Sequence, residues 1–478
     1  MKRIFLTLLA ALTAITASAA EKRPPNFIVL LIDDMGWGDF SCFGNKEAQT
    51  PNIDQLASEG IRFKQFYVNS PICSPSRCAL TTGRYPQHWS ITSFLENRAS
   101  NQRRGMAQWL DPKAPTLARC LKQAGYATGH FGKWHLGGQR DVNDAPSISS
   151  YGFDQSLTNF EGMGPKLLPL AIAPGDSKPH KIWAEAVNLG GPATWMERSK
   201  ITTGFIDAAI PFIDAAANKN QPFYLNLWPD DVHSPFWPPV DQWADGKRGL
   251  YHAVLKEMDH QFGKLFQHIR KNPDLRDNTI ILVCSDNGPE PGAGSAGPFR
   301  GSKGMLLEGG IRSPLIVWAP GMITKSKAGS TDDTSILAAI DIAPSVLKLA
   351  GVSIPADIRF DGEDHSTALL GKAPSQRKSP IFWRRPPDRK MAGEPPKLQP
   401  DLAVRDGKWK LLCNYDGSSP QLHDLETDPG EAKNLLESQP EVTRRLVKAV
   451  TTWHQSLPAD KGPELGAKIA GRKNESSE

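Results

Sequence analysis

One stretch decides how this chain is interpreted: Cys73-Ser74-Pro75-Ser76-Arg77-Cys78-Ala79-Leu80-Thr81-Thr82-Gly83-Arg84. Pro75 suits the first turn of a helix, and Gly83 is the first residue after it that suits a helix end. Cys73 then lies at the helix entrance, where free N–H groups and the helix dipole favour an anion, and Arg77 falls on the same face. The stretch therefore predicts a helix that presents a thiol and a guanidinium together. The alternative is a buried or disulfide-bonded cysteine with an unrelated basic neighbour.

Around this stretch the chain alternates between strand and helix patterns. Helical spacing of apolar residues covers 50–60, 114–124 and 251–269, with a plausible cap and a glycine stop for the first. Short apolar runs predict buried strands at 26–32, 126–131, 222–228, 279–284 and 313–318. Strands that alternate with helices indicate an α/β fold, in which a mostly parallel sheet is covered by helices on both faces.

Two further segments have a composition typical of connections. Residues 140–200 are rich in Gly, Pro, Ser and Asn, which predicts loops with short helices that shape a substrate cleft. Residues 381–400, with their Arg and Pro pairs, predict an exposed linker or insertion. Beyond them, residues 402–412 predict a hairpin around Asp406-Gly407.

The first twenty residues predict a signal peptide. Lys2 and Arg3 precede an apolar run over 4–15, and small residues at 17–20 offer a cleavage site. The run is shorter than a membrane span requires, and we see no other stretch that approaches one. We therefore expect residues 1–20 to be removed and the remaining chain to be exported, to a periplasm or outside the cell.

Length, charge and cysteine count exclude several classes of protein. A chain of 478 residues accommodates two or three domains, or one large α/β domain with a smaller one. The formal charge of +5 falls to +3 without Lys2 and Arg3, and no basic run argues for nucleic acid. Six cysteines are too few for a disulfide scaffold, and the absence of a C-x-x-C pair disfavours a thiolate zinc site.

Polar residues follow four of the predicted strands. They are Asp33-Asp34, the Gly132–His135 block, the Asp230–His233 block and the Ser285–Gly288 block. Ligands of open α/β sheets bind beyond the carboxyl ends of the strands, so we expect these side chains to converge. Calcium prefers hard oxygen ligands, which Asp33, Asp34, Asp286 and Asn287 supply, whereas zinc is disfavoured because no histidines are grouped with these acids. The alternative is that each acidic pair belongs to an ordinary solvated loop or turn.

Five cationic or proton-transfer groups accompany this set: Arg77, Lys133, His135, His233 and Lys303. Fixed cations and a metal ion can hold the charge on the oxygens of an ester of an oxyacid while its bond breaks. A histidine or lysine can then protonate the leaving alkoxide. The alternative is that both histidines are structural and that Lys303 is simply solvated.

These motifs resemble those of the type I sulfatases of the alkaline phosphatase-like superfamily. The C-x-P-S-R…T-G-R pattern of residues 73–84 and the Gly-Lys-Trp-His block are highly specific, whereas Asp-Asn-Gly alone is a weak signal. Similar blocks lie at 25–39, 50–57, 132–137, 285–288, 300–312 and 422–435, so the resemblance covers residues 24–436. It implies a large catalytic domain over 21–380, with an alkaline phosphatase-like sheet sandwiched by helices. It also implies a smaller C-terminal α+β subdomain over 381–478, whose antiparallel sheet completes the cleft.

The resemblance further implies hydrolysis of a sulfate ester. A formylglycine-generating or anaerobic sulfatase-maturating enzyme oxidises the motif cysteine, Cys73, to formylglycine (3-oxoalanine), whose hydrate is the nucleophile. Calcium is bound by Asp33, Asp34, Asp286, Asn287 and the modified Cys73. Arg77 and Lys133 hold the hydrate and the sulfate, and His135 assists the hydrate. His233 and Lys303 face the leaving oxygen, with His233 as the proton donor.

The block around His233 fits the family pattern only loosely, and Asp230 and Asp231 have no counterpart in it. Trp228, Phe236 and Trp237 flank His233, where they either stack on a sugar face or belong to the core. Exported sulfatases of this kind commonly act on sulfated sugars, so we favour a sulfated saccharide over a simple aryl sulfate. The rival hypotheses are a phosphonate or phosphate monoester hydrolase of the same superfamily and a noncatalytic sulfated-glycan-binding protein with Cys73 unmodified.

Overall fold

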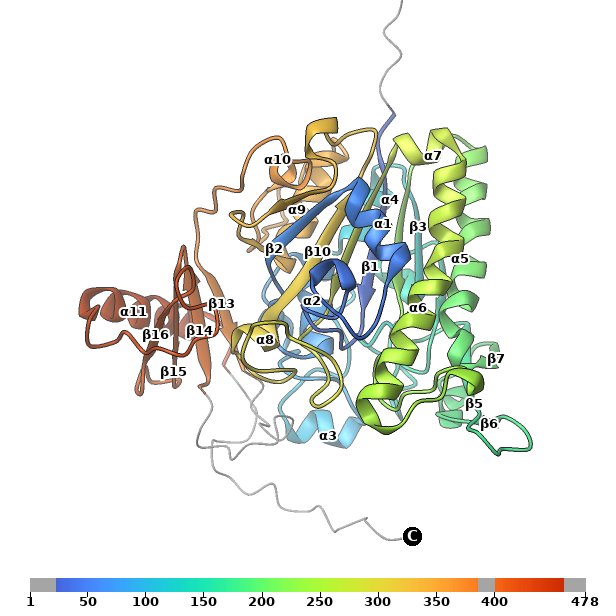
Figure 1. The fold of residues 1–478 in the computed structure, drawn as a ribbon, viewed down its shortest axis with the longest axis horizontal. Coiled ribbons are helices and arrows are strands. Elements are labelled where there is room, and N and C mark those ends of the chain that lie inside the picture. The colour runs from blue at the N-terminus through green and yellow to red at the C-terminus, as the bar shows by residue number, and fades with distance from the viewer. Residues whose placement is uncertain (1–22, 386–399, 460–478) are drawn as a thin grey trace, which may run out of the picture.

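The computed structural model describes residues 23–385 and 400–459 (Figure 1). The predicted signal peptide lies outside the described residues, as does most of the predicted linker. Within the described residues, no helix combines the length and the apolar character needed to cross a membrane.

A twelve-stranded sheet forms the centre of the molecule, in the order β11-β2-β10-β9-β1-β8-β3-β4-β5-β6, with β12 beside β2 and β7 beside β5. The pairs around β1 are parallel, whereas β10 runs antiparallel to both of its neighbours and β6 runs antiparallel to β5. The strands are β1 (Asn26–Ile32), β2 (Ile61–Tyr67), β3 (Ala127–Gly132), β4 (Gln155–Thr158), β5 (Lys166–Ala171), β6 (His180–Lys181), β7 (Ala193–Glu197), β8 (Phe223–Trp228), β9 (Thr279–Ser285), β10 (Arg312–Trp318), β11 (Ser330–Asp332) and β12 (Leu337–Ala338).

Helices cover both faces of this sheet, and β1 shows why. Alternate side chains of a strand point to opposite faces, and all seven residues of β1 are buried. Ile28 and Leu30 pack in one core with α1 (Pro51–Glu59), α5 (Ile201–Asn218) and α6 (Gly246–Lys271). Phe27 and Val29 pack in a second core with α2 (Cys73–Thr82), α4 (Leu117–Gln123) and α9 (Ile342–Leu349). The shorter helices are α3 (Arg98–Arg103), α7 (Pro273–Asp277), α8 (Glu308–Ile311) and α10 (Ser366–Leu369).

A separate four-stranded antiparallel sheet lies beside the large one (Figure 1). It comprises β13 (Ile381–Arg384), β14 (Leu402–Asp406), β15 (Trp409–Cys413) and β16 (Gln421–Asp424). The helix α11 (Pro440–Ser456) packs on it through Leu446 and Val450. Trp383 joins this sheet to the large one, since its indole N–H donates to the Val68 carbonyl at 2.6 Å.

The observed elements confirm the predicted α/β class and its smaller antiparallel unit. The five predicted strands correspond to β1, β3, β8, β9 and β10, and the hairpin at 402–412 is β14–β15. Two predictions are wrong in part. Residues 140–200 contain the strands β4 to β7, whose short mixed sequences carry little periodicity. Residues 381–384 are not an exposed linker but the strand β13, which is largely buried.

Candidate active site

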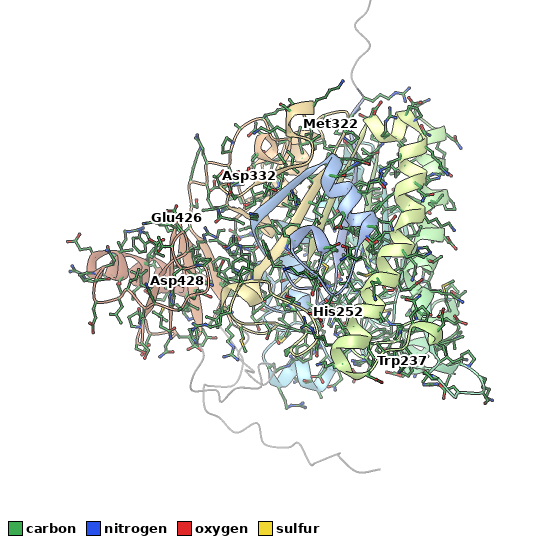
Figure 2. All side chains as sticks on the ribbon, viewed as in Figure 1. Trp237, His252, Met322, Asp332, Glu426 and Asp428 are labelled. Atoms are coloured by element: carbon green, nitrogen blue, oxygen red, sulfur yellow. The ribbon has the colours of Figure 1, made fainter. Side chains whose placement is uncertain are left out.

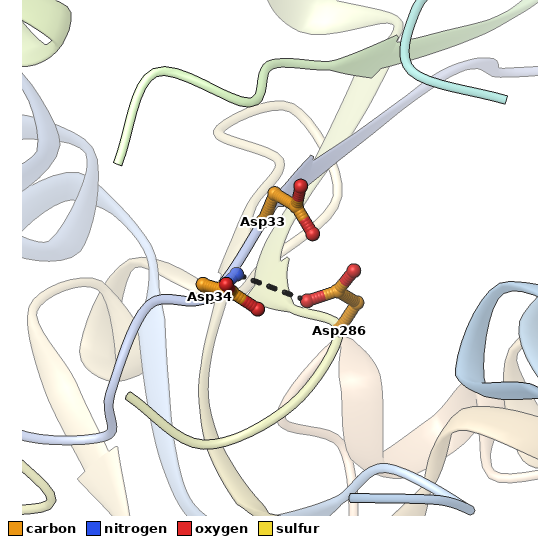
Figure 3. Close-up of side chains that lie close together, drawn as sticks. All are labelled: Asp33, Asp34 and Asp286. Carbon is orange, nitrogen blue, oxygen red and sulfur yellow. Dashed lines mark hydrogen bonds between the residues drawn. The ribbon is translucent and has the colours of Figure 1, made fainter. Parts of the chain in front are cut away.

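Three carboxylates meet at the carboxyl ends of β1 and β9. These strands pair in parallel with Ile32 opposite Ser285, so Asp33 and Asp34 emerge beside Asp286 (Figure 3). The three side chains are fully buried, and each offers an oxygen within 4.8 Å of the others. The backbone of Asp34 is left-handed, with φ of 57°, and its N–H donates to Asp286 Oδ1 at 3.1 Å. Parallel pairing thus brings together acids that lie 252 residues apart.

The hydrogen bonds and cations of the described residues do not satisfy all the oxygens of this cluster. Burial and the charge of Asp33 raise the pKa of Asp286 to about 8, against the lowering effect of Arg77. The side-chain amide N–H of Asn287 donates to Asp34 Oδ1 at 2.9 Å, while its own Oδ1 is buried without a hydrogen-bond partner among the described residues. Buried polar oxygens are normally paired, so this set has coordination capacity left over. Carboxylate and amide oxygens at this density fit a hard divalent cation such as calcium.

The helix α2 begins at Cys73 and brings the motif to this cluster. All ten residues of α2 are buried, and Gly83 ends the helix with φ of 65°, as the sequence predicts. Burial raises the pKa of Cys73 to about 12, although the charges of Lys133 and Lys303 act in the opposite direction. A thiol must ionise to act as a nucleophile, so burial makes the unmodified thiol of Cys73 a poor nucleophile.

Arg77 ties the helix to the acids. Its Nη2 lies 2.7 Å from Asp286 Oδ2 and 3.0 Å from Asp33 Oδ1, and its Nη1 donates to the Lys133 carbonyl at 2.9 Å. The guanidinium carbon also lies 5.3 Å from the ring centroid of Trp228, which is fully buried. Arg77 is therefore fixed from several sides and its charge cannot move away from the cluster.

Lys133 and His135 follow β3 at the same edge of the sheet. Lys133 Nζ lies 2.8 Å from Asp33 Oδ2 and 3.0 Å from Glu161 Oε2. His135 Nε2 lies 2.8 Å from the Leu95 carbonyl, and its Nδ1 lies 3.3 Å from Glu161 Oε2. Burial lowers the pKa of His135 to about 3, although Glu161 acts to raise it. Burial raises the pKa of Asp33, but Lys133 and Arg77 outweigh this effect and hold it well below its ordinary value.

Lys303 and His233 approach the cluster at Asp34. Lys303 Nζ donates to Asp34 Oδ2 at 2.5 Å, and His233 Nε2 lies 3.5 Å from the same oxygen. The other nitrogen of His233 lies 2.8 Å from the Ser234 carbonyl. The His233 side chain is 25% exposed, which makes it the most accessible of the predicted site residues, so it marks the open side of the site.

All the predicted site residues are thus brought to one edge of the sheet. Sequence reasoning missed Glu161, which contacts both Lys133 and His135; it follows the short strand β4, which has no clear strand pattern. Asp230 and Asp231 do not join the cluster. Asp230 pairs with Arg198 at 2.7 Å, and Asp231 accepts a hydrogen bond from Thr202 at 2.6 Å.

Of the three aromatic residues near His233, only one remains available at the surface. Trp228 is fully buried beneath Arg77, and Phe236 is buried against Tyr251 with ring centroids 5.4 Å apart. Both belong to the core, as the alternative interpretation has it. Trp237, which is labelled in Figure 2, is half-buried. Its ring centroid lies 5.7 Å from that of His180 of β6.

Comparison with known proteins places this site in a family. The family model described as Sulfatase matches residues 25–352, and the model described as N-sulphoglucosamine sulphohydrolase, C-terminal matches residues 299–456. Arylsulfatase A of Bos taurus is 31% identical over 91% of this chain and 88% of its own length. The N-acetylgalactosamine-6-sulfatase of Homo sapiens is 31% identical over 94% of this chain and 89% of its own. The crystal structure of Ps i-CgsB in complex with k-i-k-neocarrahexaose superposes with a TM-score of 0.76 at 26% identity, covering 92% of this chain and 94% of that one.

The fold, the site and these matches define the class of protein, a hydrolase of sulfate esters. The chain belongs to the sulfatase family, since the family model covers more than half of its length and relatives above 30% identity span nine-tenths of it.

Proposed function

We propose that this sulfatase removes sulfate from a sulfated saccharide, with a formylglycine formed from Cys73 and with calcium bound by Asp33, Asp34, Asp286 and Asn287. The observation that carries the proposal is the convergence at one buried edge of the thiol, three carboxylates and the charges of Arg77, Lys133 and Lys303. Burial raises the pKa of the Cys73 thiol to about 12 and makes it a poor nucleophile, so we assign the nucleophile to a modified Cys73.

Two groups would each supply one kind of chemistry when present: a formylglycine at position 73 would supply a nucleophilic oxygen, and calcium would supply a Lewis acid. The residues that would hold the ion are all hard oxygen donors, and the orphaned Oδ1 of Asn287 is available for such a bond.

The protein's own side chains bind the sulfate and move protons. Arg77 and Lys133 offer fixed positive charge for the sulfate oxygens in a site from which water is largely excluded. The Ser234 carbonyl can only accept a hydrogen bond, so Nδ1 of His233 carries a proton. When both ring nitrogens are protonated, Nε2 is the one that can give its proton to the leaving oxygen, and Nε2 is then left with its lone pair. Lys303 lies beside the same carboxylate as His233 and holds negative charge on that side of the site.

The Leu95 carbonyl accepts a hydrogen bond from Nε2–H of His135 by the same argument, so Nδ1 is the nitrogen that would receive a proton. The negative charge of Glu161, 3.3 Å from Nδ1, favours that protonated form. The two histidines therefore have different roles. One gives a proton on the open side of the site, and the other receives a proton in its buried part.

The names of the relatives favour a saccharide as substrate. One relative is named as an N-acetylgalactosamine-6-O-sulfatase of Bacteroides thetaiotaomicron, and the similar crystal structure holds a neocarrahexaose. The half-buried Trp237, four residues after His233 in the chain, offers an apolar surface for a sugar ring. These points support a sulfated saccharide over a simple aryl sulfate.

The proposal also assigns parts of the chain. Residues 1–20 are the signal peptide of a protein exported to the periplasm or beyond the cell, residues 21–380 are the catalytic domain, and residues 381–478 are the subdomain that completes the cleft. The start of β13 at Ile381 supports the division.

One experiment tests the function. The full chain is produced in a host with a formylglycine-forming enzyme, the Cys73 peptide is analysed by mass spectrometry, and desulfation of sulfated mono- and oligosaccharides is measured beside their phosphate isosteres. We expect an aldehyde at Cys73 and turnover of at least one sulfated sugar. Preference for the phosphate isostere by orders of magnitude would overturn the proposal in favour of a phosphate or phosphonate ester hydrolase. An intact thiol with retained glycan binding would favour a noncatalytic binding protein.

A further inference from the structure

A buried carboxylate lies where the sulfate of the substrate is expected to bind. Glu161 follows β4, and its side chain is 7% exposed. A single oxygen, Oε2, lies 3.0 Å from Lys133 Nζ and 3.3 Å from His135 Nδ1. Negative charge beside an anion subsite opposes the binding of the anion, and burial of a carboxylate costs free energy unless it is paired. The position of Glu161 therefore calls for a reason other than substrate binding.

The backbone holds Glu161 in this place from two sides. The His135 N–H donates to the Glu161 carbonyl at 2.8 Å, and the Glu161 N–H donates to the side-chain oxygen of Asn159 at 2.8 Å. Asn159 in turn donates to Asp230 at 2.9 Å. These two bonds fix the backbone of Glu161 beside His135, so the side chain starts from a fixed point next to Lys133 and His135.

The contacts of Lys133 indicate the role of the Glu161 carboxylate. Its ammonium group has two acidic partners, Asp33 at 2.8 Å and Glu161 at 3.0 Å. Asp33 belongs to the proposed calcium ligands, whereas Glu161 has no ion pair or hydrogen bond to that cluster among the described residues. Glu161 is thus a second counter-ion of Lys133, so the ammonium group does not pair with Asp33 alone.

We propose that Glu161 is a positioning residue that holds Lys133 on a carboxylate oxygen, beside Nδ1 of His135, and sets the charge balance between the sulfate and calcium subsites. It weakens sulfate binding, which favours release of the product, and strengthens calcium binding. The inference rests on the proposed function, because it takes the Asp33 cluster as the calcium site and Lys133 as a sulfate ligand.

The test uses affinities and not turnover, so it needs no formylglycine. Inorganic sulfate is titrated by calorimetry into the full chain with Cys73 as a thiol and calcium present, and calcium is titrated in a separate experiment. In Glu161→Gln the amide keeps the shape and one acceptor oxygen but loses the charge. We expect sulfate to bind roughly tenfold more tightly and calcium roughly tenfold more weakly than in the wild type.

The matched control is Glu185→Gln, an exposed glutamate 3.8 Å from Arg140, where the same change of charge is screened by solvent. We expect both of its affinities to stay within about twofold of the wild type. If Glu161→Gln does not fold, Glu161→Asp is used instead, because it withdraws the carboxylate by one methylene. We then expect smaller changes of the sulfate and calcium affinities in the same directions.

The signs separate this role from a structural one. A purely structural role weakens both affinities together, and an irrelevant residue changes neither, so either result overturns the inference. If the wild type binds calcium and sulfate, the proposed subsites stand whatever the variant does. If the wild type binds neither, also when position 73 carries formylglycine, the proposed function itself is overturned and this inference with it.

Discussion

The ammonium group of Lys410 lies 3.0 Å from the carboxylate of Glu308, although 102 residues separate them in the chain. Lys410 belongs to β15 of the small sheet, and Glu308 begins α8, five residues after Lys303. Glu431 completes the cluster, 2.8 Å from Lys410 Nζ, and accepts the Glu308 N–H at 2.7 Å. The small sheet is thus bonded directly to the loop that carries Lys303.

Loss of Lys410 is expected to destabilise the protein strongly. Lys410→Met leaves two carboxylates buried without their shared cation, and breaking such a pair costs about 3–5 kcal/mol. The free energy of unfolding is measured in urea. Lys408→Met is the matched control, because Lys408 pairs with Asp424 at the exposed end of the same sheet and its loss should change little. Equal effects of the two substitutions would show that the buried cluster contributes no more to the free energy of unfolding than an exposed ion pair does.

The same cluster predicts how stability depends on pH. Burial raises the pKa of Glu308, but Lys410 and Arg312 outweigh it and hold the pKa at about 2, against 4.5 as the ordinary value. A carboxyl with a depressed pKa contributes stability that is full above about pH 4.5 and is lost as the pH falls toward 2. The contribution is about 3 kcal/mol, from the size of this shift. Burial raises the pKa of the neighbouring Glu431, which offsets part of it.

The measurement is urea unfolding at several values of pH within that window. In the wild type we expect the free energy of unfolding to fall steeply with falling pH. Glu308→Gln cannot ionise, so its stability should be lower near neutrality and should depend less on pH. A variant curve that runs parallel to that of the wild type would contradict the assignment.

Calcium is expected to stabilise the protein through Asp286. At a calcium concentration about 100-fold above the dissociation constant, linkage adds about 2.7 kcal/mol to the free energy of unfolding. Asp286→Asn should abolish this calcium-dependent gain, and a chelator should remove both the gain and the activity of the wild type. Asp230→Asn is the control: this buried acid lies at the same edge but pairs with Arg198, so the calcium effect should persist. If the free energy of unfolding of the wild type does not change with calcium concentration, the prediction is wrong.

Loss of His233 should matter most for substrates with a poor leaving group. A positioned general acid contributes about 10²–10⁴-fold in rate, and less when the leaving group needs no proton. His233→Ala should therefore reduce kcat on a sulfated sugar by that factor, and on an acidic aryl sulfate by less than about tenfold. His180→Ala, an exposed histidine of β6, should change neither rate. Equal losses on both substrates would assign His233 another role.

Trp237 is expected to affect binding of a saccharide and not the chemistry. Removal of a half-buried aromatic surface from a sugar contact should cost about 1 kcal/mol, so Trp237→Ala should raise KM for a sulfated oligosaccharide about fivefold. We expect kcat to stay within about twofold, and KM for a small aryl sulfate to be unchanged. A parallel rise of KM on both substrates would indicate that the loop of His233 has been disturbed.

How much of the site the sequence could predict depended on the strand before each residue. β1 and β9 are continuous apolar runs, so the meeting of Asp33 and Asp286 at their ends followed from parallel pairing. β4 is short, and Glu161 after it gave no signal. Lys410 looked like an ordinary charged residue of a hairpin, because its partner Glu308 depends on how two sheets dock. Periodicity describes local structure, and such docking is decided by packing over long distances.

The burial of Cys73 limits when this residue can be oxidised. Only 3% of this residue is accessible, and the whole of α2 around it is covered. An oxidising enzyme must bring its own reactive atoms into contact with the sulfur, which the folded chain covers almost completely. The proposed oxidation of Cys73 therefore belongs to the interval between synthesis of the chain and completion of its fold. The rate of oxidation relative to the rate of folding then determines what fraction of the molecules become active.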